Sequence, residues 1–177
     1  MMDNQNIPNR KTDHILINLN QDVSSTAKSG FDTIRFENEA LPEFNLVEVD
    51  TRQTLFGKTI DIPLLISSMT GGAGEALKIN RHLALAAQEK KIAMGVGSQR
   101  PMVEDQNNLE GFQIRKYAPK ILLFANLGAI QLNYGYSAED CQRAVDLIEA
   151  DGLFLHLNPL QEALQPEGET QFSGLLD

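Results

Sequence analysis

Residues 121–128 read Ile-Leu-Leu-Phe-Ala-Asn-Leu-Gly, five apolar side chains that end in amide and glycine residues. Three other short, largely apolar runs, at 64–68, 92–96 and 153–157, end in or are followed by polar or glycine residues. Runs this short that are apolar on both faces are typical of strands in a buried parallel sheet. From the start of one run to the next are 28, 29 and 32 residues, about the length of a βα unit. The sequence therefore predicts an α/β fold with four successive βα units.

Helical patterns separate these runs. Residues 75–90 place apolar side chains at three- and four-residue spacing, which indicates an amphipathic helix. Ser137 and Asp140 are a helix-capping pair, and they predict a helix that continues to about Ala150. Residues 108–117 carry a weaker helical pattern. We expect these helices to cover the parallel sheet.

The first 62 residues follow a different pattern. Their expected elements are a helix, a polar link and two short strands or a hairpin, at residues 9–19, 23–30, 44–49 and 53–60. We expect a hairpin that directly precedes the first strand of the sheet to cover the sheet's N-terminal end. The predicted organisation is thus an N-terminal extension, 1–62, and the first half of a barrel, 63–177.

Composition excludes several classes of protein. The chain has 177 residues with a net charge of −9, and this acidity argues against nucleic-acid binding. One cysteine and no tryptophan exclude a disulfide scaffold, and we expect Cys141 to be structural because it lacks a basic neighbour. The longest apolar runs are far below the 18 or so residues that span a membrane, and no leader pattern is present. These features favour a cytosolic protein that binds neither nucleic acid nor membrane.

Polar residues follow each predicted strand, where ligands bind in parallel α/β folds. The plain alternative is that turns and helix caps use the same residue types. Four such endings together predict a functional rim. The endings are Ser68-Met69-Thr70-Gly71-Gly72, Gly97-Ser98-Gln99-Arg100, Asn126-Leu127-Gly128 and His156-Leu157-Asn158-Pro159-Leu160-Gln161-Glu162.

Positive charges occur in two places that suit a phosphate group. Arg10, Lys11 and His14 share one side of the first predicted helix, which makes either a phosphate-binding patch or a solvated surface. Arg100 follows the second strand and is a candidate for a second phosphate contact. The residues alone leave both alternatives open.

The last strand ending carries the other candidate groups. His156 alternates with Phe154 and Asn158 on one face of the strand, and it is either a core residue or part of a site. Glu162 could bind Mg²⁺, which prefers carboxylate and phosphate oxygens, and Gln161 beside it is a neutral donor and acceptor.

These motifs resemble, in order, those of the type 2, flavin-dependent isopentenyl-diphosphate isomerases. Besides the four strand endings, the matching pieces are Arg10-Lys11-x-x-His14, Phe31-Asp32 with Arg35-Phe36, and Met94-Gly95-Val96. The resemblance implies a (β/α)8 TIM barrel that interconverts isopentenyl and dimethylallyl diphosphate in isoprenoid biosynthesis. It also implies FMN, reduced by NADPH, together with Mg²⁺, a small-molecule diphosphate substrate and a homo-octamer.

The resemblance also implies roles for individual residues. Gln161 and His156 are the expected catalytic residues, and Glu162 is the expected Mg²⁺ ligand. The expected FMN contacts are Ser68, Met69, Thr70, Ser98 and Asn126. The expected substrate contacts are Arg10, Lys11, Ser98, Gln99, Arg100, Asn158 and Gln161.

The length of the chain qualifies this resemblance. A complete (β/α)8 barrel takes about 250 residues, so we expect this chain to supply about the first four βα units, as a fragment or truncated chain that is incomplete for activity. Two alternatives remain open at this point. One is another FMN-dependent barrel of the hydroxy-acid oxidase type, and the other is a non-catalytic half-barrel that binds a partner.

Overall fold

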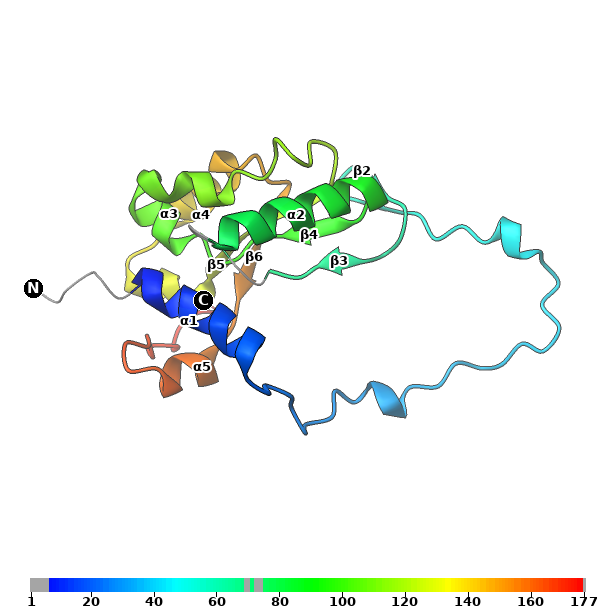
Figure 1. The fold of residues 1–177 in the computed structure, drawn as a ribbon, viewed down its shortest axis with the longest axis horizontal. Coiled ribbons are helices and arrows are strands. Elements are labelled where there is room, and N and C mark those ends of the chain that lie inside the picture. The colour runs from blue at the N-terminus through cyan, green and yellow to red at the C-terminus, as the bar shows by residue number, and fades with distance from the viewer. Residues whose placement is uncertain (1–6, 69–70, 72–74, 177) are drawn as a thin grey trace, which may run out of the picture. The chain divides into compact units, whose positions relative to one another are not determined.

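A computed structural model describes residues 7–68, 71 and 75–176 of the chain. Its centre is a parallel sheet of four strands in chain order (Figure 1). The strands are β3 Leu65–Ile66, β4 Ala93–Gly95, β5 Leu123–Gly128 and β6 Gly152–His156. Each strand overlaps one of the four apolar runs, so the predicted parallel sheet is confirmed.

The sheet is open within the described part of the chain. Among those residues β3 pairs only with β4 and β6 only with β5, so they form no closed barrel. The central strand β5 is buried at every position, as a parallel strand covered on both faces should be. Its register sets Asn126 beside Phe154 and Gly128 beside His156. This pairing brings the ends of β5 and β6 together.

The longer helices begin where the sequence predicts. α2 spans Glu75–Lys90, and α4 spans Ala138–Leu147 with Ser137 and Asp140 as a reciprocal capping box. α4 ends earlier than the predicted Ala150 because Glu149 has a φ of 53°, which helical backbone does not allow. A short helix, α5 Pro159–Leu164, follows β6.

The helix predicted over residues 108–117 is wrong. The structure has a short helix, α3 Arg100–Glu104, followed by a 3-10 segment, η3 Gln106–Phe112. Phe112 and Ile114 are both completely buried in one core. Residues two apart point to nearly opposite sides of an α-helix, so an irregular backbone is required to bury both.

The predicted hairpin over residues 53–60 is confirmed. β1 Gln53–Leu55 and β2 Lys58–Ile60 pair antiparallel, and both turn residues, Phe56 and Gly57, have positive φ as a type I′ turn requires. The Phe56 ring packs edge-on against Phe124, with ring centroids 5.5 Å apart.

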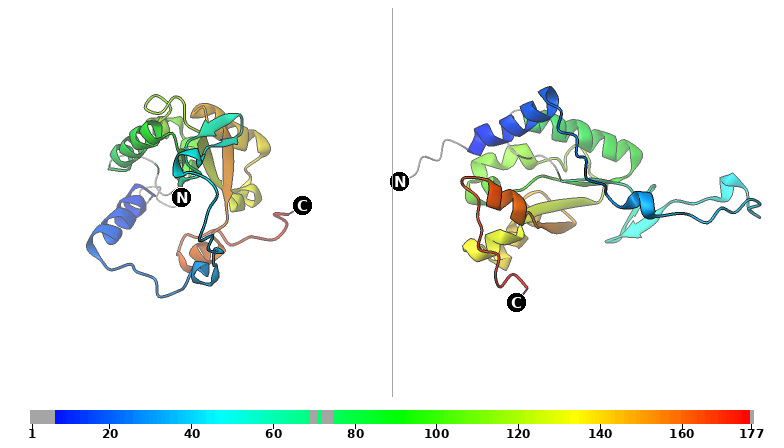
Figure 2. Two further views of the ribbon diagram at one scale, coloured as in Figure 1. Left: turned by 90° about the vertical axis from the view of Figure 1, so that its right-hand side faces the viewer. Right: turned by 90° about the horizontal axis from the view of Figure 1, so that it is seen from below.

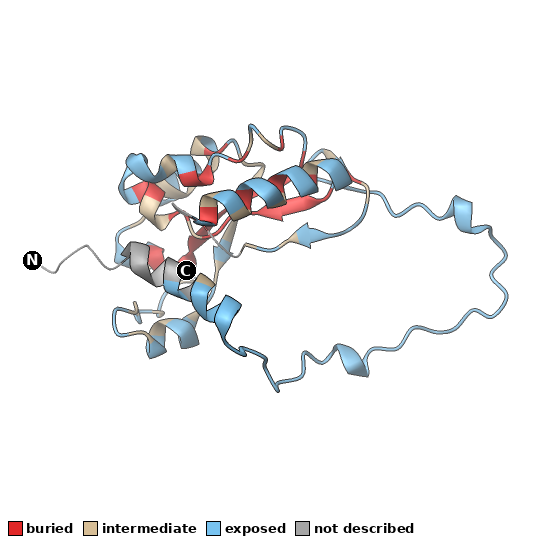
Figure 3. Cartoon of the chain, in the orientation of Figure 1, coloured by how far each residue is buried: buried red, intermediate tan, exposed pale blue. Residues whose placement is uncertain are grey.

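Two apolar clusters lie on opposite faces of the sheet. The larger packs the helices against the strand residues Met94, Leu123 and Leu127. Figure 2 shows helices lying against the sheet, and Figure 3 shows buried backbone in the strands and along the side of α2 that faces them. The smaller contains Ile60 of the hairpin together with strand residues of the other face, namely Ala93, Leu122, Phe124 and Phe154. The hairpin therefore covers one end of the sheet's second face.

Residues 1–62 do not all belong to one unit. The chain divides into Met1–Thr51 and Arg52–Asp177, so the hairpin groups with the sheet. The first unit contains α1 Ile7–Asn20, which agrees with the predicted helix, and the 3-10 turns η1 Phe31–Thr33 and η2 Leu46–Glu48. Almost all of its described side chains are exposed.

The strand predicted over residues 44–49 is wrong. The Asn45 N–H donates to Glu48 Oε2 over 2.8 Å, and the Glu48 N–H donates to the Asn45 carbonyl over 2.9 Å. These local bonds stabilise a 3-10 turn there. Leu46 and Val47 are 86% and 94% exposed, so within the described part of its own unit this apolar stretch is not packed as a strand would be.

Asp151 ties the hairpin to the start of β5. Its carboxylate lies 2.8 Å from Lys58 Nζ and 3.0 Å from Arg115 Nη2, and it accepts the Leu123 N–H over 2.8 Å. Burial alone would raise the pKa of Asp151, but the bonds from Lys58, Leu123 and Arg115 lower it below the ordinary value. The carboxylate therefore contributes to stability in its charged form.

Replacing Asp151 tests this contribution. Asp151→Ala leaves the half-buried Lys58 and Arg115 without their shared anion, and we expect the free energy of unfolding to fall by about 3 kcal/mol. Urea denaturation measures the loss. Asp146→Ala is the control, because this exposed carboxylate of α4 accepts a hydrogen bond from Gln142 of its own helix, and its loss should cost less than about 0.5 kcal/mol.

The same variant should show a defined pH dependence. Because the folded-state pKa of Asp151 is lowered, its contribution is complete above the unfolded-state pKa of about 3.9 and is lost as the pH falls through the folded value. The wild-type and Asp151→Ala stabilities should therefore converge in acid. A difference that stays constant from pH 7 down to pH 3 would contradict the assignment.

Candidate functional site

The carboxyl ends of the four strands meet at one edge of the sheet. Ser68 follows β3, the turn containing Ser98 follows β4, Asn126 lies near the end of β5, and His156 ends β6. A Cβ atom added at Gly128 would lie 3.2 Å from His156 Nε2, which shows how closely the last two strand ends approach. The strand ends therefore form one rim, as predicted.

Ser68 places an unsatisfied hydroxyl in this rim. Its Oγ is buried and has no hydrogen-bond partner among the described residues. A Cβ atom at Gly95 would collide with this Oγ, so only glycine at position 95 allows the approach. Buried hydroxyls are normally hydrogen-bonded, and an orphaned one at a strand end fits a site for a polar ligand. The neighbouring Met69 and Thr70, also predicted to bind FMN, lie outside the described residues.

Gln99 is buried completely, although the family resemblance implies that it contacts substrate. Its Oε1 accepts the Asn126 N–H over 2.9 Å, and its Nε2 donates to the Ala144 carbonyl of α4 over 2.9 Å. Its own N–H donates to the Asn126 carbonyl over 2.8 Å. In this arrangement Gln99 positions β5 and α4, and its amide does not face solvent.

Asn126 and His156 form a polar pair between β5 and β6. Asn126 Oδ1 lies 2.7 Å from His156 Nδ1. Because an amide oxygen only accepts, Nδ1 carries the proton and Nε2 is the acceptor of the neutral ring. Burial lowers the pKa of His156, against the opposing charge of Glu162 and a bond to Leu127. The imidazole is therefore neutral at pH 7, since its ordinary pKa is about 6.5.

Arg100 begins α3 and lies between two carboxylates. Its Nε lies 2.9 Å from Glu104 Oε1, and its Nη1 lies 3.0 Å from Glu169 Oε2. Burial alone would lower the pKa of Arg100, but the bond to Glu104 and the charge of Glu169 raise it. The guanidinium stays charged, and 37% of the side chain remains exposed to a ligand.

Three of the predicted site residues, Asn158, Gln161 and Glu162, lie together at the start of α5. Asn158 Nδ2 donates to Glu162 Oε1 over 2.8 Å and to Gln161 Oε1 over 3.3 Å. The other carboxylate oxygen of Glu162 accepts the Glu169 N–H over 2.9 Å. Gln161 is exposed and Glu162 is half-buried.

Glu162 suits a metal ion that takes most of its ligands from water and substrate. Among residues 7–68, 71 and 75–176, no three His, Cys, Asp or Glu side chains are grouped closely enough to hold a metal ion by themselves. Glu162 is the carboxylate that the sequence predicts as the ligand. Mg²⁺ commonly takes only one or two protein carboxylates and completes its shell with water and substrate phosphate, which fits this arrangement.

The predicted cationic patch lies on α1, in the other unit of the chain. Arg10, Lys11 and His14 all fall within α1, but their side chains lie outside what the structure describes. The rim lies in the unit Arg52–Asp177, and each of the two units is described by itself. Ser98 is half-buried in the turn between β4 and α3.

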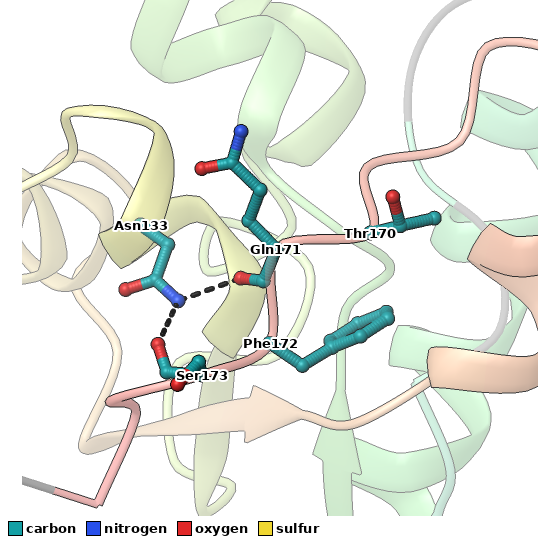
Figure 4. A pocket seen from close by; sticks show the side chains of 5 residues that line it. All are labelled: Asn133, Thr170, Gln171, Phe172 and Ser173. Carbon is teal, nitrogen blue, oxygen red and sulfur yellow. Dashed lines mark hydrogen bonds between the residues drawn. The ribbon is translucent and has the colours of Figure 1, made fainter.

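The segment after α5 carries no motif that predicts a role in the site. Glu169 contacts Arg100, Gln131 and Glu162, yet in the sequence it is one of many acidic residues near the C-terminus. A pocket of about 630 Å³ lies beside this segment (Figure 4). Its lining residues are Asn133, Thr170, Gln171, Phe172 and Ser173. Only the chain's three-dimensional path brings Asn133 to this segment, so no local pattern could have indicated it.

Two other expectations concern the rest of the chain. Cys141 is partly buried against the larger core cluster, and both burial and the neighbouring Asp140 raise the pKa of its thiol, which agrees with a structural role. None of the helices that the structure describes combines the length and hydropathy that crossing a bilayer needs.

Comparison with known proteins places these observations in a family. A family model described as FMN-dependent dehydrogenase matches residues 4–114. Similar proteins named isopentenyl-diphosphate delta-isomerase occur in a Nostoc species (51% identical, 99% of this chain, 50% of the relative) and a Synechocystis species (56%, 95% and 48%). Another from Rickettsia canadensis is 50% identical over 99% of this chain and 52% of its own. The chain thus spans about half the length of these curated relatives, and the resemblance stated from the motifs is confirmed.

Replacing Gln99 tests the buried bridge. Gln99→Leu keeps the volume but leaves the Asn126 N–H and the Ala144 carbonyl buried without partners, so we expect the free energy of unfolding to fall by about 2–3 kcal/mol. Denaturant titration measures it. Gln106→Leu, at an exposed position of η3, should change it by less than about 0.5 kcal/mol. Equal effects of the two substitutions would show that the bridge contributes nothing.

Proposed function

Because this chain belongs to the FMN-dependent dehydrogenase family, we propose that its rim is part of the active site of an isopentenyl-diphosphate delta-isomerase. The reaction moves the double bond of isopentenyl diphosphate to give dimethylallyl diphosphate. The main support is that a neutral His156, the charged Arg100 and the Asn158–Glu162 pair lie at one edge of the sheet. The chain that carries them is 50–56% identical to proteins named isopentenyl-diphosphate delta-isomerase.

We propose that the open sheet is part of a (β/α)8 barrel. In such a barrel further strands would adjoin the edges of β3 and β6. The helices on one face and the apolar cluster on the other match the outside and the interior of a barrel. The rim then corresponds to the face where barrel enzymes bind their ligands.

FMN is the proposed cofactor. Its proposed contacts are Ser68, Met69, Thr70, Ser98 and Asn126. The orphaned Ser68 hydroxyl and the close approach that Gly95 allows both support a polar ligand at this place. When bound in its reduced form, FMN supplies acid–base chemistry at the allylic carbons, and NADPH supplies the reducing equivalents.

The substrate would bind through charge at one end and shape at the other. Arg100 and the cationic residues Arg10 and Lys11 are proposed to bind the diphosphate, and Glu162 its Mg²⁺. The neutral His156 is held by Asn126, so its Nε2 can accept a hydrogen bond from a bound group. Gln161 is proposed to lie at the reacting end. The remaining proposed contacts are Ser98 and Asn158, while the buried amide of Gln99, bonded to Asn126 and Ala144, is proposed to position this strand end.

The proposal extends to the protein's setting. We propose that it acts in the cytosol as a homo-octamer, as the resemblance implies. A diphosphate substrate fits the cytosol, since it is a water-soluble anion and its recognition here needs neither membrane nor nucleic acid.

The direct test uses the full natural polypeptide. It is incubated without oxygen with FMN, NADPH, Mg²⁺ and isopentenyl diphosphate, and dimethylallyl diphosphate is measured. We expect turnover that needs the reduced flavin and the metal. A protein that binds FMN but gives no product would contradict the isomerase proposal.

The family description favours one second candidate, a flavin enzyme of the hydroxy-acid oxidase type. That reaction takes two electrons and two protons from a 2-hydroxy acid and passes them to oxygen, which gives a 2-oxo acid and hydrogen peroxide. The same protein preparation is therefore assayed in air with 2-hydroxy acids. Peroxide formation without isomerisation would favour the second candidate.

Glu162 provides a sharper test of the metal site. In Glu162→Gln the amide loses the charge that attracts Mg²⁺, so the Mg²⁺ concentration for half-maximal rate should rise by about tenfold, or about 1.4 kcal/mol. The absorbance of bound FMN should stay unchanged. Glu167→Gln, an exposed neighbour, is the control and should leave the metal response as it is. An unchanged response in Glu162→Gln would remove Glu162 from the metal site.

A further inference from the structure

One residue contacts both of the groups proposed to hold the diphosphate and its metal. Glu169 lies in the segment after α5. Its Oε2 lies 3.0 Å from Arg100 Nη1, and its N–H donates to Glu162 Oε2 over 2.9 Å. Arg100 follows β4 and Glu162 lies in α5, so Glu169 joins side chains from two different strand endings.

The Glu169 carboxylate is itself held in place. Its side chain is only 14% exposed. Gln131, a buried residue of η4 Ala129–Tyr134, donates its Nε2–H to the same Oε2 that contacts Arg100. A carboxylate that is buried and bonded from two sides has few other orientations available.

The backbone on the C-terminal side of Glu169 is anchored to η4 as well. Asn133 Nδ2 donates to the carbonyls of Gln171 and Ser173 over 2.6 and 2.8 Å (Figure 4). The Tyr134 hydroxyl accepts the N–H of Thr170 over 3.1 Å. These bonds fix the segment that carries Glu169 to the loop following β5.

Arg100 needs this support to keep one orientation. On its own helix it contacts Glu104, which is 42% exposed and which also accepts the Tyr136 hydroxyl over 3.1 Å. The bonds to Glu104 and Glu169 use Nε and Nη1, so among the described residues Nη2 is left to bind an incoming anion. With Glu104 alone, the guanidinium could rotate about an exposed ion pair.

We propose that Glu169 is a positioning residue, which holds Arg100 and Glu162 in the arrangement that receives a diphosphate and its Mg²⁺. This inference rests on the proposed function of those two residues. The physical reason is preorganisation: side chains ordered before binding lose less conformational entropy when the ligand arrives. Glu169 acts through its two partners and is given no contact with the ligand.

The test compares Glu169→Gln with Glu167→Gln in the full natural polypeptide. Calorimetry measures the affinity for inorganic pyrophosphate with Mg²⁺, and the isomerase assay measures kcat and KM. The glutamine keeps the size of the side chain but weakens its bond to Arg100. We expect pyrophosphate affinity to fall and KM to rise by about fivefold to tenfold, with kcat within about twofold. Glu167→Gln should match the wild type.

Asn133→Ala gives a second variant, since it releases the anchored segment without touching Arg100 or Glu162. We expect this variant to weaken pyrophosphate binding by a smaller factor than Glu169→Gln does. That result would support the inference even if Glu169→Gln does not fold. Unchanged binding in the folded variants would overturn the inference. Tighter binding in Glu169→Gln would also overturn it, because Glu169 would then compete with the ligand for Arg100.

The binding arm separates this inference from the proposed function. A wild-type protein that binds Mg²⁺-pyrophosphate but does not isomerise would contradict the isomerase proposal alone, and the Glu169 variants would still be decided by calorimetry. A wild-type protein that isomerises isopentenyl diphosphate but does not bind Mg²⁺-pyrophosphate would overturn the Glu169 inference alone.

Discussion

The buried side chain of Gln99 is the constraint on which the rim depends. It joins the end of β4 to the backbone of Asn126 in β5 and to the Ala144 carbonyl in α4. A parallel sheet fixes its strands by ladder bonds, but it does not by itself fix the turns that follow them. The buried amide supplies this second constraint, because any movement of the turn would leave its partners unpaired in the core. Because this bridge fixes the backbone of Asn126, it also positions the Asn126–His156 pair.

The sequence predicted the parts of the fold that depend on local pattern. The four parallel strands follow from short apolar runs, the start of α4 from the Ser137 cap, and the hairpin from the strand pattern over residues 53–60. The predictions from sequence are wrong where contacts between distant parts of the chain determine the local structure. Burial of both Phe112 and Ile114 in the core requires an irregular backbone where the pattern predicts a helix. Residues 44–49 have the composition of a strand but form a 3-10 turn.

The candidate site divides in the same way. The strand endings carry their polar residues in the sequence, so Ser68, Asn126, His156 and Glu162 could be named from it, and the fold brings their strand ends to one edge. Motif matching could not show that Gln99 is buried, because this depends on a carbonyl of α4 that is 45 residues away. Glu169 carries no local signal either, since its importance comes from Arg100 and Gln131, both more than 35 residues earlier.

The account as a whole depends on the rim being the place where ligands bind. The most direct measurement is an experimental structure of the full natural polypeptide with FMN, Mg²⁺ and isopentenyl diphosphate bound. The account predicts the flavin against Ser68 and Asn126, and the diphosphate and metal between Arg100 and Glu162. Ligands bound elsewhere, with these four side chains free of contact, would contradict it.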